Sequence, residues 1–277
     1  ESGKYEDAVK AFQNALGESI GHIGEKELDI CFYKAKAQAL DGKTKDALAT
    51  YNAIIKYNKD ARAYYLRGDL YMDMGEEKKG RADFESAVQQ GKKNYEIYIG
   101  IYESLSRHEK KDEGQKYLSA AMEIKGDKPE DELYKGRISY LLGEKKDAIS
   151  YLEKAKEHKQ MLASYYLGLA YDANGDSDKA KKCIAEYIKS GVATSYDLYE
   201  LGMQEMQDGN YKNALTYFNS GLELEKVPNK QNLMKSAIAA YEYSGDFDSA
   251  KKMMKEYLKA YPDDEEAKHE NTFLETR

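Results

Sequence analysis

Apolar side chains recur every three or four residues along most of this chain, and short breaks that contain glycine interrupt them. Within 61–88, one such face is made of Tyr64, Gly68 and Tyr71, and a second is made of Gly80, Phe84 and Ala87. Spacings of three and four place residues on one side of an α-helix. The break at Met74–Gly75 separates the two faces. The segment therefore predicts two amphipathic helices joined by a short turn.

The same two-helix pattern is repeated along the chain. Each copy has a small residue, a second small residue about twelve positions later and a bulky apolar residue four further on, as in Gly168, Ala180 and Ile184. The next copy, with Gly202 and Ala214, follows after 34 residues. A fixed period of this length is typical of stacked helix pairs that bury a core between neighbours. We therefore predict an all-α solenoid.

The repeat resembles the tetratricopeptide repeat, whose signature has Leu-Gly, Tyr, Ala and Phe at set intervals. The residues that carry the resemblance include Leu167-Gly168-Leu169-Ala170-Tyr171 with Ala180, and Leu201-Gly202 with Tyr211, Ala214 and Phe218. The resemblance covers nearly the whole chain. It implies a right-handed superhelical solenoid of about seven helix-turn-helix units. It also implies that the first helices line a concave groove that binds extended peptides or helices.

The period divides the chain, which we predict to be one solenoid domain over 1–277. Its predicted parts are an N-terminal half-repeat (1–16), repeats over 28–60, 61–92, 93–128, 129–160, 161–194, 195–230 and 231–262, and a capping helix (263–277). Because the chain begins inside a repeat, we expect it to be a piece or a processed form of a longer protein. The glycine-rich stretch Gly17–Gly24 predicts an enlarged loop.

Two copies depart from the common spacing. In the third copy, Gly100 and Gly114 are further apart than the corresponding pairs elsewhere, which predicts two extra residues between the helices in 107–111. In the last copy, Ile238 stands where a small residue is expected. A large side chain at that contact predicts a splayed helix pair.

Composition narrows the classes of partner. The formal net charge is −7, and the lysine pairs along the chain are next to acidic residues, so a nucleic-acid partner is not expected. Tyrosine is abundant, with 26 residues against 6 phenylalanines, which favours helices with one packed and one open face. No apolar run is long enough to predict a membrane span. The compartment stays open between the cytoplasm and an extracytoplasmic lipoprotein anchored to a membrane.

Catalytic and cofactor sites are not expected. The segment 37–44 approximates a phosphate-binding loop, but an amphipathic helix precedes it and Gly42 falls at the turn position of its repeat. The four histidines and the two distant cysteines, Cys31 and Cys183, show no metal-ligand spacing. No nucleophile turn is present. We therefore predict a protein that is not an enzyme and that binds no metal and no small-molecule cofactor.

The groove that the resemblance implies can be located by counting along each first helix from its small residue. Three positions before it, the side chains are mostly apolar: Phe32, Tyr65, Ile97, Leu133, Tyr165, Tyr199 and Lys235. Positions one and four after it share that face and hold, in the last copy, Ala239 and Glu242. The predicted partner-binding residues are Tyr65, Tyr140, Tyr165, Leu169, Tyr199, Met203 and Met206. Packing against the adjacent repeat would explain some of these rings equally well.

Together these patterns predict a protein-interaction scaffold that binds a peptide or a helical segment of a protein through apolar contacts. The lysine and asparagine clamp of chaperone-binding relatives is absent from the corresponding positions. A self-associating module is an alternative, in which exposed terminal helices such as the one with Tyr5, Val9, Phe12 and Leu16 pair in a homodimer. A targeting arm of a larger protein is another.

Overall fold

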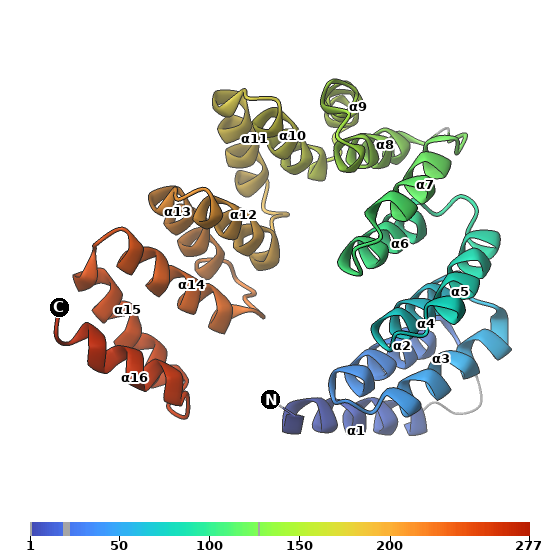
Figure 1. The fold of residues 1–277 in the computed structure, drawn as a ribbon, viewed down its shortest axis with the longest axis horizontal. Coiled ribbons are helices and arrows are strands. Elements are labelled where there is room, and N and C mark those ends of the chain that lie inside the picture. The colour runs from blue at the N-terminus through green and yellow to red at the C-terminus, as the bar shows by residue number, and fades with distance from the viewer. Residues whose placement is uncertain (1, 19–22, 127) are drawn as a thin grey trace. The chain divides into compact units, whose positions relative to one another are not determined.

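The structure is a computed structural model that describes residues 2–18, 23–126 and 128–277, and within them it contains helices and no β-strand (Figure 1). The helices are α1 (Ser2–Glu18), α2 (Glu25–Leu40), α3 (Thr44–Asn58), α4 (Ala61–Asp73), α5 (Glu77–Gln90), α6 (Tyr95–Arg107), α7 (Lys111–Met122) and α8 (Pro129–Leu142). They continue as α9 (Lys145–Glu157), α10 (Leu162–Ala173), α11 (Ser177–Lys189), α12 (Ser195–Gln207), α13 (Tyr211–Leu222), α14 (Lys230–Tyr243), α15 (Phe247–Ala260) and α16 (Glu265–Leu274). The fold is therefore all-α and of the superhelical repeat type, as the periodicity predicts. Part of the enlarged loop expected at Gly17–Gly24 lies outside the described residues.

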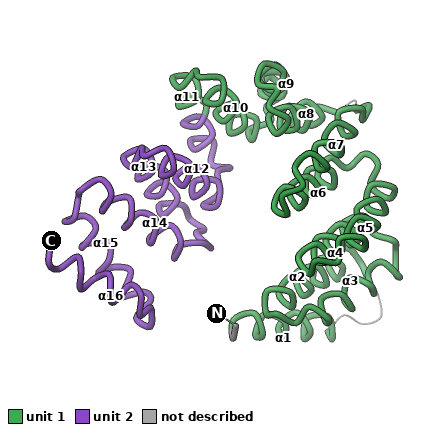
Figure 2. Tube along the Cα trace, viewed as in Figure 1, with its two compact units in different colours: residues 1–183 green, residues 184–277 purple. Residues whose placement is uncertain are grey.

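The helices belong to two compact units, residues 1–183 and residues 184–277 (Figure 2). The boundary falls inside α11, after Cys183. Unit 1 contains α1 to α10, and unit 2 contains α12 to α16. Each unit is described separately below.

Within each unit the helices are stacked in pairs. Helix α4 packs against α5, α6 against α7 and α8 against α9 in unit 1, and α12 against α13 and α14 against α15 in unit 2. The even-numbered helices from α2 to α14, called the first helices here, also contact one another, as α4 does with α6 and α12 with α14. Helix α1 packs against α2, and the ring of Phe12 stacks on Tyr33 at a centroid distance of 6.1 Å.

In the pairs α4/α5, α8/α9 and α12/α13, a bulky side chain of the second helix enters a gap beside a glycine of the first. A Cβ atom added at Gly202 would lie 2.3 Å from Cε1 of Phe218, and one at Gly136 would lie 2.4 Å from Cγ of Leu152. Both partners, Phe218 and Leu152, are fully buried. Because such distances leave no room for a side chain, glycine is needed at these contacts. Burial of each bulky side chain contributes about 1.5–3 kcal/mol.

In the third pair, the small and the large residue of this contact are on exchanged helices. The prediction of two extra residues between its helices is wrong. The connection between α6 and α7 runs from His108 to Lys110, and it is as long as the one from Met74 to Glu76 between α4 and α5. A Cβ at Gly114 would lie 3.1 Å from Cδ2 of Tyr102. Tyr102 of the first helix therefore holds the contact position, and the glycine is on the second helix.

Gly100 contacts the preceding helix pair and not the second helix of its own pair. A Cβ at Gly100 would lie 2.6 Å from Cζ of Tyr65, so this glycine makes room for a tyrosine ring of the preceding first helix. Because of this shift of two positions, Ile97, which was expected to line the groove, is in the core, and so are Ile101 and Ser104, one and four positions after Gly100. Their exposed fractions are 3%, 0% and 0%.

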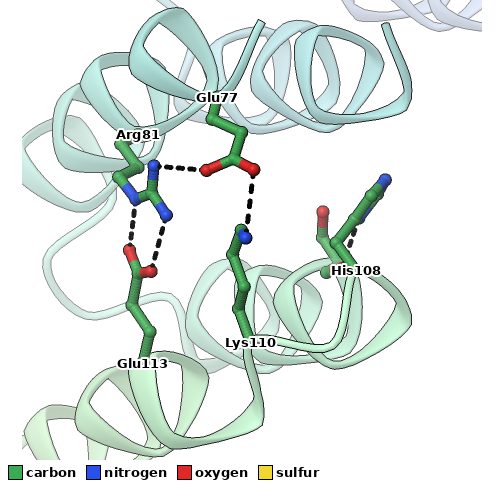
Figure 3. Close-up of polar contacts among 6 residues, drawn as sticks. Glu77, Arg81, His108, Lys110 and Glu113 are labelled. Carbon is green, nitrogen blue, oxygen red and sulfur yellow. Dashed lines mark hydrogen bonds and ion pairs between the residues drawn. The ribbon is translucent and has the colours of Figure 1, made fainter. Parts of the chain in front are cut away.

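Ion pairs connect the second pair with the third (Figure 3). Arg81 of α5 donates through Nε and Nη2 to the two carboxylate oxygens of Glu113 on α7, at 2.8 and 3.0 Å. Its Nη1 donates to Glu77, which also accepts from Lys110 at 3.0 Å. The bonds that Arg81 donates to Glu113 and Glu77 raise the pKa of Arg81, and those to Glu113 lower the pKa of Glu113. Bidentate geometry fixes the angle as well as the distance between the two helices.

The last pair accommodates its large residue. Ile238 is buried and packs in one cluster with Ala250 and Met254. Methionine has a flexible unbranched side chain that adapts to irregular space. Helices α14 and α15 therefore remain in contact, and a cavity, described below, opens beside Ile238 and Met254.

In the turn of the third pair, a residue other than glycine has a positive φ. Glu109 has a φ of 60° at the position where the turn of the fourth pair has Gly143 with a φ of 82°. A side chain in this left-handed region costs roughly 1–2 kcal/mol, partly offset by the greater freedom of glycine in the unfolded chain. We therefore expect Glu109→Gly to raise the free energy of unfolding by about 1 kcal/mol in urea denaturation followed by circular dichroism.

The reverse exchange is the control. Gly143 is exposed and no atom would touch a Cβ there, so Gly143→Glu tests backbone strain alone. It should lower the free energy of unfolding by about 1 kcal/mol. A stability that is unchanged or lower in Glu109→Gly would contradict this account of the turn.

Candidate partner-binding surface

In unit 1, the structure places the predicted groove residues on three first helices. Tyr65 is on α4, Tyr140 on α8, and Tyr165 and Leu169 are on α10, and all four are half-buried. The ring of Tyr65 lies against Gly100 and 6.4 Å from the ring of Phe84. Burial raises the pKa of Tyr65, and the charge of Asp69 raises it further. Tyr65 is therefore mainly part of the packing between α4 and α6.

The other two predicted groove tyrosines of unit 1 are Tyr140 and Tyr165. Tyr140 packs against the core cluster that contains Leu133 and Leu167, and burial raises its pKa. Tyr165 meets Tyr166 edge to face, with ring centroids 5.1 Å apart. Such a pair keeps part of each ring accessible while holding its orientation.

In unit 2, the three predicted residues form one stripe along α12. Tyr199, Met203 and Met206 are spaced as on one helical face, and all three pack partly against the cluster around Phe218. The ring of Tyr199 is 6.2 Å from that of Phe218. Sδ of Met203 accepts a hydrogen bond from Oγ of Ser236 on α14 at 3.6 Å. The stripe is half-buried, so its outer side is apolar and accessible.

Several of the side chains three positions before the small residue of each first helix belong to the core. Phe32, Ile97 and Leu133 are exposed by only 5%, 3% and 8%. The predicted row of aromatic side chains is therefore interrupted in unit 1, where packing between repeats takes up part of it.

Charged bridges between first helices were missed by the sequence reasoning. Their partners are Arg62 with Asp29 at 3.3 Å, Arg107 with Asp69 at 2.6 Å, and Arg137 with Glu103 at 3.0 Å and Glu96 at 3.3 Å. In each case the arginine of one first helix reaches an acid of the preceding one. This surface of unit 1 is therefore more polar than the counted positions indicate.

A cavity of about 280 Å³ lies in unit 2 between α14, the first helix of the last pair, and the terminal helix α16. Its lining comes from α14 (Lys235, Ile238, Ala239, Glu242), α15 (Met254, Tyr257) and α16 (Glu266, Ala267, Glu270). Lys235, Ala239 and Glu242 are the residues that the counting rule selects in the last copy. In the last copy, the positions that were predicted to face a groove therefore line a cavity.

Asp264 joins the three helices that surround this cavity. Its carboxylate accepts hydrogen bonds from the Tyr257 hydroxyl at 2.5 Å, from Nζ of Lys235 at 2.9 Å and from the backbone N–H of Ala267 at 3.1 Å. The last bond caps the N-terminus of α16. These donors hold the pKa of Asp264 well below its ordinary range, with the Tyr257 hydroxyl as the largest cause. Bonding to Asp264 raises the pKa of Lys235 to about 12.

The described residues give no support to a metal site or a phosphate loop. No group of three or more metal-ligating side chains is found among them. Residues 25–58 form a helix, a turn and a helix, and Gly42 is in the turn with a φ of 75°. Neither Cys31 nor Cys183, both in the described part of the chain, forms a disulfide bond. None of the described helices has the length and apolarity that crossing a membrane requires.

Comparison with known families decides the assignment. Sequence profiles described as tetratricopeptide repeat match residues 1–56 and 32–95, and a second profile of that description matches 162–190 and 231–264. The chain belongs to the tetratricopeptide repeat family. Repeats of this family serve as scaffolds for protein–protein interaction, and the chain is a scaffold of this kind. No curated protein sequence matches it.

Solved tetratricopeptide repeat structures share the fold at low sequence identity. The yeast Tom70 structure aligns with a TM-score of 0.58 and 14% identity over 99% of this chain and 59% of that one. A tetratricopeptide repeat protein from Parabacteroides merdae ATCC 43184 aligns with a TM-score of 0.51 and 12% identity over 86% of this chain and 93% of that one. At these identities the likeness shows the fold alone.

The bonds to Asp264 predict how the terminal helix responds to acid. A carboxyl whose folded pKa is depressed stabilises the protein above its unfolded pKa of about 4, and this stabilisation is lost as the pH falls toward the folded value. Asp264→Asn should therefore lower the urea midpoint at pH 7, and the difference from the unsubstituted protein should shrink below about pH 4.

The exposed neighbour Asp263 provides the matched control. Asp263→Asn should leave the midpoint nearly unchanged at both pH values. A difference between Asp264→Asn and the unsubstituted protein that stays constant from pH 7 to pH 3 would show that the charge of Asp264 is not what anchors α16.

Proposed function

We propose that this scaffold binds a peptide or helical segment of a partner protein on the side of its first helices, mainly through apolar contacts. The observation that carries the proposal is in unit 2. There the half-buried stripe of Tyr199, Met203 and Met206 and the cavity beside Ala239 lie on consecutive first helices that contact each other. Partly exposed aromatic and methionine side chains next to a cavity are typical of surfaces that bind protein segments.

Unit 1 offers a second stretch of the same kind. Tyr165 and Leu169 are half-buried on α10, and arginine–carboxylate bridges occupy the earlier first helices. We propose that Tyr165 and Leu169 contribute apolar contacts, whereas the bridges limit where an apolar segment can bind. Desolvating a bridged charge without a replacement partner is unfavourable.

The proposed partner is a protein and the proposed role is non-catalytic. The net charge of −7 disfavours a nucleic-acid backbone. Self-association through α1 is less favoured, because Val9 is buried and Phe12 stacks on Tyr33 of α2, which occupies part of the apolar stripe that a second chain would need. A role as the targeting arm of a larger protein is compatible with the same binding surface.

A peptide selected on the full chain from a random displayed library tests the proposal. We expect Tyr165→Ala combined with Tyr199→Ala to weaken binding of that peptide by about tenfold or more in fluorescence anisotropy, because truncated aromatic contacts commonly cost above 1 kcal/mol. Helical circular dichroism should be retained. Met203→Gln, which keeps the length of the side chain, should weaken binding in the same direction.

The matched control is Tyr151→Ala combined with Tyr217→Ala. These tyrosines are also half-buried, one in each unit, but they are on the second helices α9 and α13. The control should bind the peptide as the unsubstituted chain does. Equal affinities of the Tyr165/Tyr199 variant and the control would refute binding on the first helices.

A further inference from the structure

The cavity of unit 2 has an apolar interior and an acidic rim. Ile238, Ala239, Met254 and Ala267 supply apolar surface, and Glu242, Glu266 and Glu270 supply carboxylates. Glu242 is on α14 and Glu270 is on α16, so the two carboxylates line the cavity from different helices. The cavity is therefore lined by apolar side chains and by carboxylates that come from two different helices.

Glu242 and Glu270 are not neutralised by a cation within the described part of the chain. Among the described residues that line the cavity, Lys235 is the one cation, and it is paired with Asp264 at 2.9 Å and Glu266 at 3.3 Å. Oε1 of Glu242 is buried and has no hydrogen-bond partner. Burial raises the pKa of Glu242, and the charge of the neighbouring Glu270 and a side-chain hydrogen bond between the two carboxyl groups raise it further. A buried carboxylate oxygen without a partner is an unfavourable arrangement that a donor from outside would relieve.

The size of the cavity limits what that donor can be. Pockets for small organic ligands have volumes of about 300–1,000 Å³, and this cavity, at about 280 Å³, is close to the lower limit of that range. One long side chain is a better fit. Lysine and arginine combine an apolar stem, which packs on aliphatic surface, with a cationic head that donates hydrogen bonds.

We infer that the cavity between α14 and α16 receives a lysine or arginine side chain of the bound segment, an inference that rests on the function proposed above. The stem lies over Ile238, Ala239 and Met254. The cationic head lies between the carboxylates of Glu242 and Glu270, and donates to the unpartnered oxygen of Glu242.

This arrangement gives the bound segment a defined register in unit 2. The stripe of Tyr199, Met203 and Met206 on α12 accepts apolar side chains, and the cavity on the adjacent α14 accepts the basic one. A segment with apolar residues followed or preceded by one lysine or arginine satisfies both. Apolar contacts supply most of the affinity, and the charged contact selects the sequence.

The test uses a peptide selected on the full chain, with each of its basic residues replaced in turn by norleucine, which keeps the stem and removes the charge. At one position, norleucine should weaken binding to the unsubstituted chain by about tenfold or more. Against the variant with Glu242→Gln and Glu270→Gln, the same replacement should change the affinity by less than about threefold, because the coupled charges are gone.

A matched variant separates a specific contact from general attraction by negative charge. Glu223→Gln with Glu256→Gln removes the same charge at two exposed positions, one at the C-cap of α13 and one on α15, that do not line the cavity. It should keep the tenfold effect of norleucine. The thermal midpoint of the Glu242/Glu270 variant should equal or exceed that of the unsubstituted chain, because a like-charged pair has been removed.

The outcomes distinguish the two proposals. If peptides bind and depend on Tyr165 and Tyr199, but no basic position matters or its effect persists in the Glu242/Glu270 variant, the cavity inference is wrong and the proposed function stands. If no peptide is selected on the full chain, both are wrong.

Discussion

Close approach of two helices at one small residue is the constraint on which the rest of the structure depends. Phe218 enters the space that Gly202 leaves open, and Leu152 does the same at Gly136. The third pair, with Tyr102 on its first helix, has Gly114 on the second, so the glycine and the large residue have exchanged helices. The last pair combines Ile238 with Ala250 and the adaptable Met254. The contact thus tolerates exchange of its partners but not two large rigid groups together.

The first helices have two tasks, and these compete for the same side chains. Packing between neighbouring pairs buries Phe32, Ile97 and Leu133, which cannot then meet a partner. In unit 1 much of the remaining surface is taken by arginine–carboxylate bridges between consecutive first helices. In unit 2 the apolar stripe of α12 and the acidic cavity remain available. The chemistry open to a partner therefore differs between the units although the backbone pattern is the same.

The periodic small residues and turn glycines predicted the helices, their pairing and the turn at Gly42, because these features depend on short-range spacing. Gly100 was misinterpreted since it has the right size for the contact position but makes room for Tyr65 instead. Glu109 held the correcting signal: it occupies the turn position, and counting back from it leads to Tyr102. The bridge from Arg137 to Glu96 and the cavity at Glu242 could not be predicted in this way. They depend on how neighbouring helices are positioned, which one sequence does not specify.

A photo-crosslinking amino acid placed on α12 or α13 tests most directly whether partners bind on the first helices. Benzoylphenylalanine is introduced at Tyr199 in one protein and at Tyr217 in another, and each is irradiated with the same selected peptide. Tyr199 is on the first helix of the pair and Tyr217 on the second, and both are half-buried. Binding on the first helices predicts a covalent peptide adduct from position 199 and little or none from 217. Equal adducts from both positions, or an adduct from 217 alone, would contradict it.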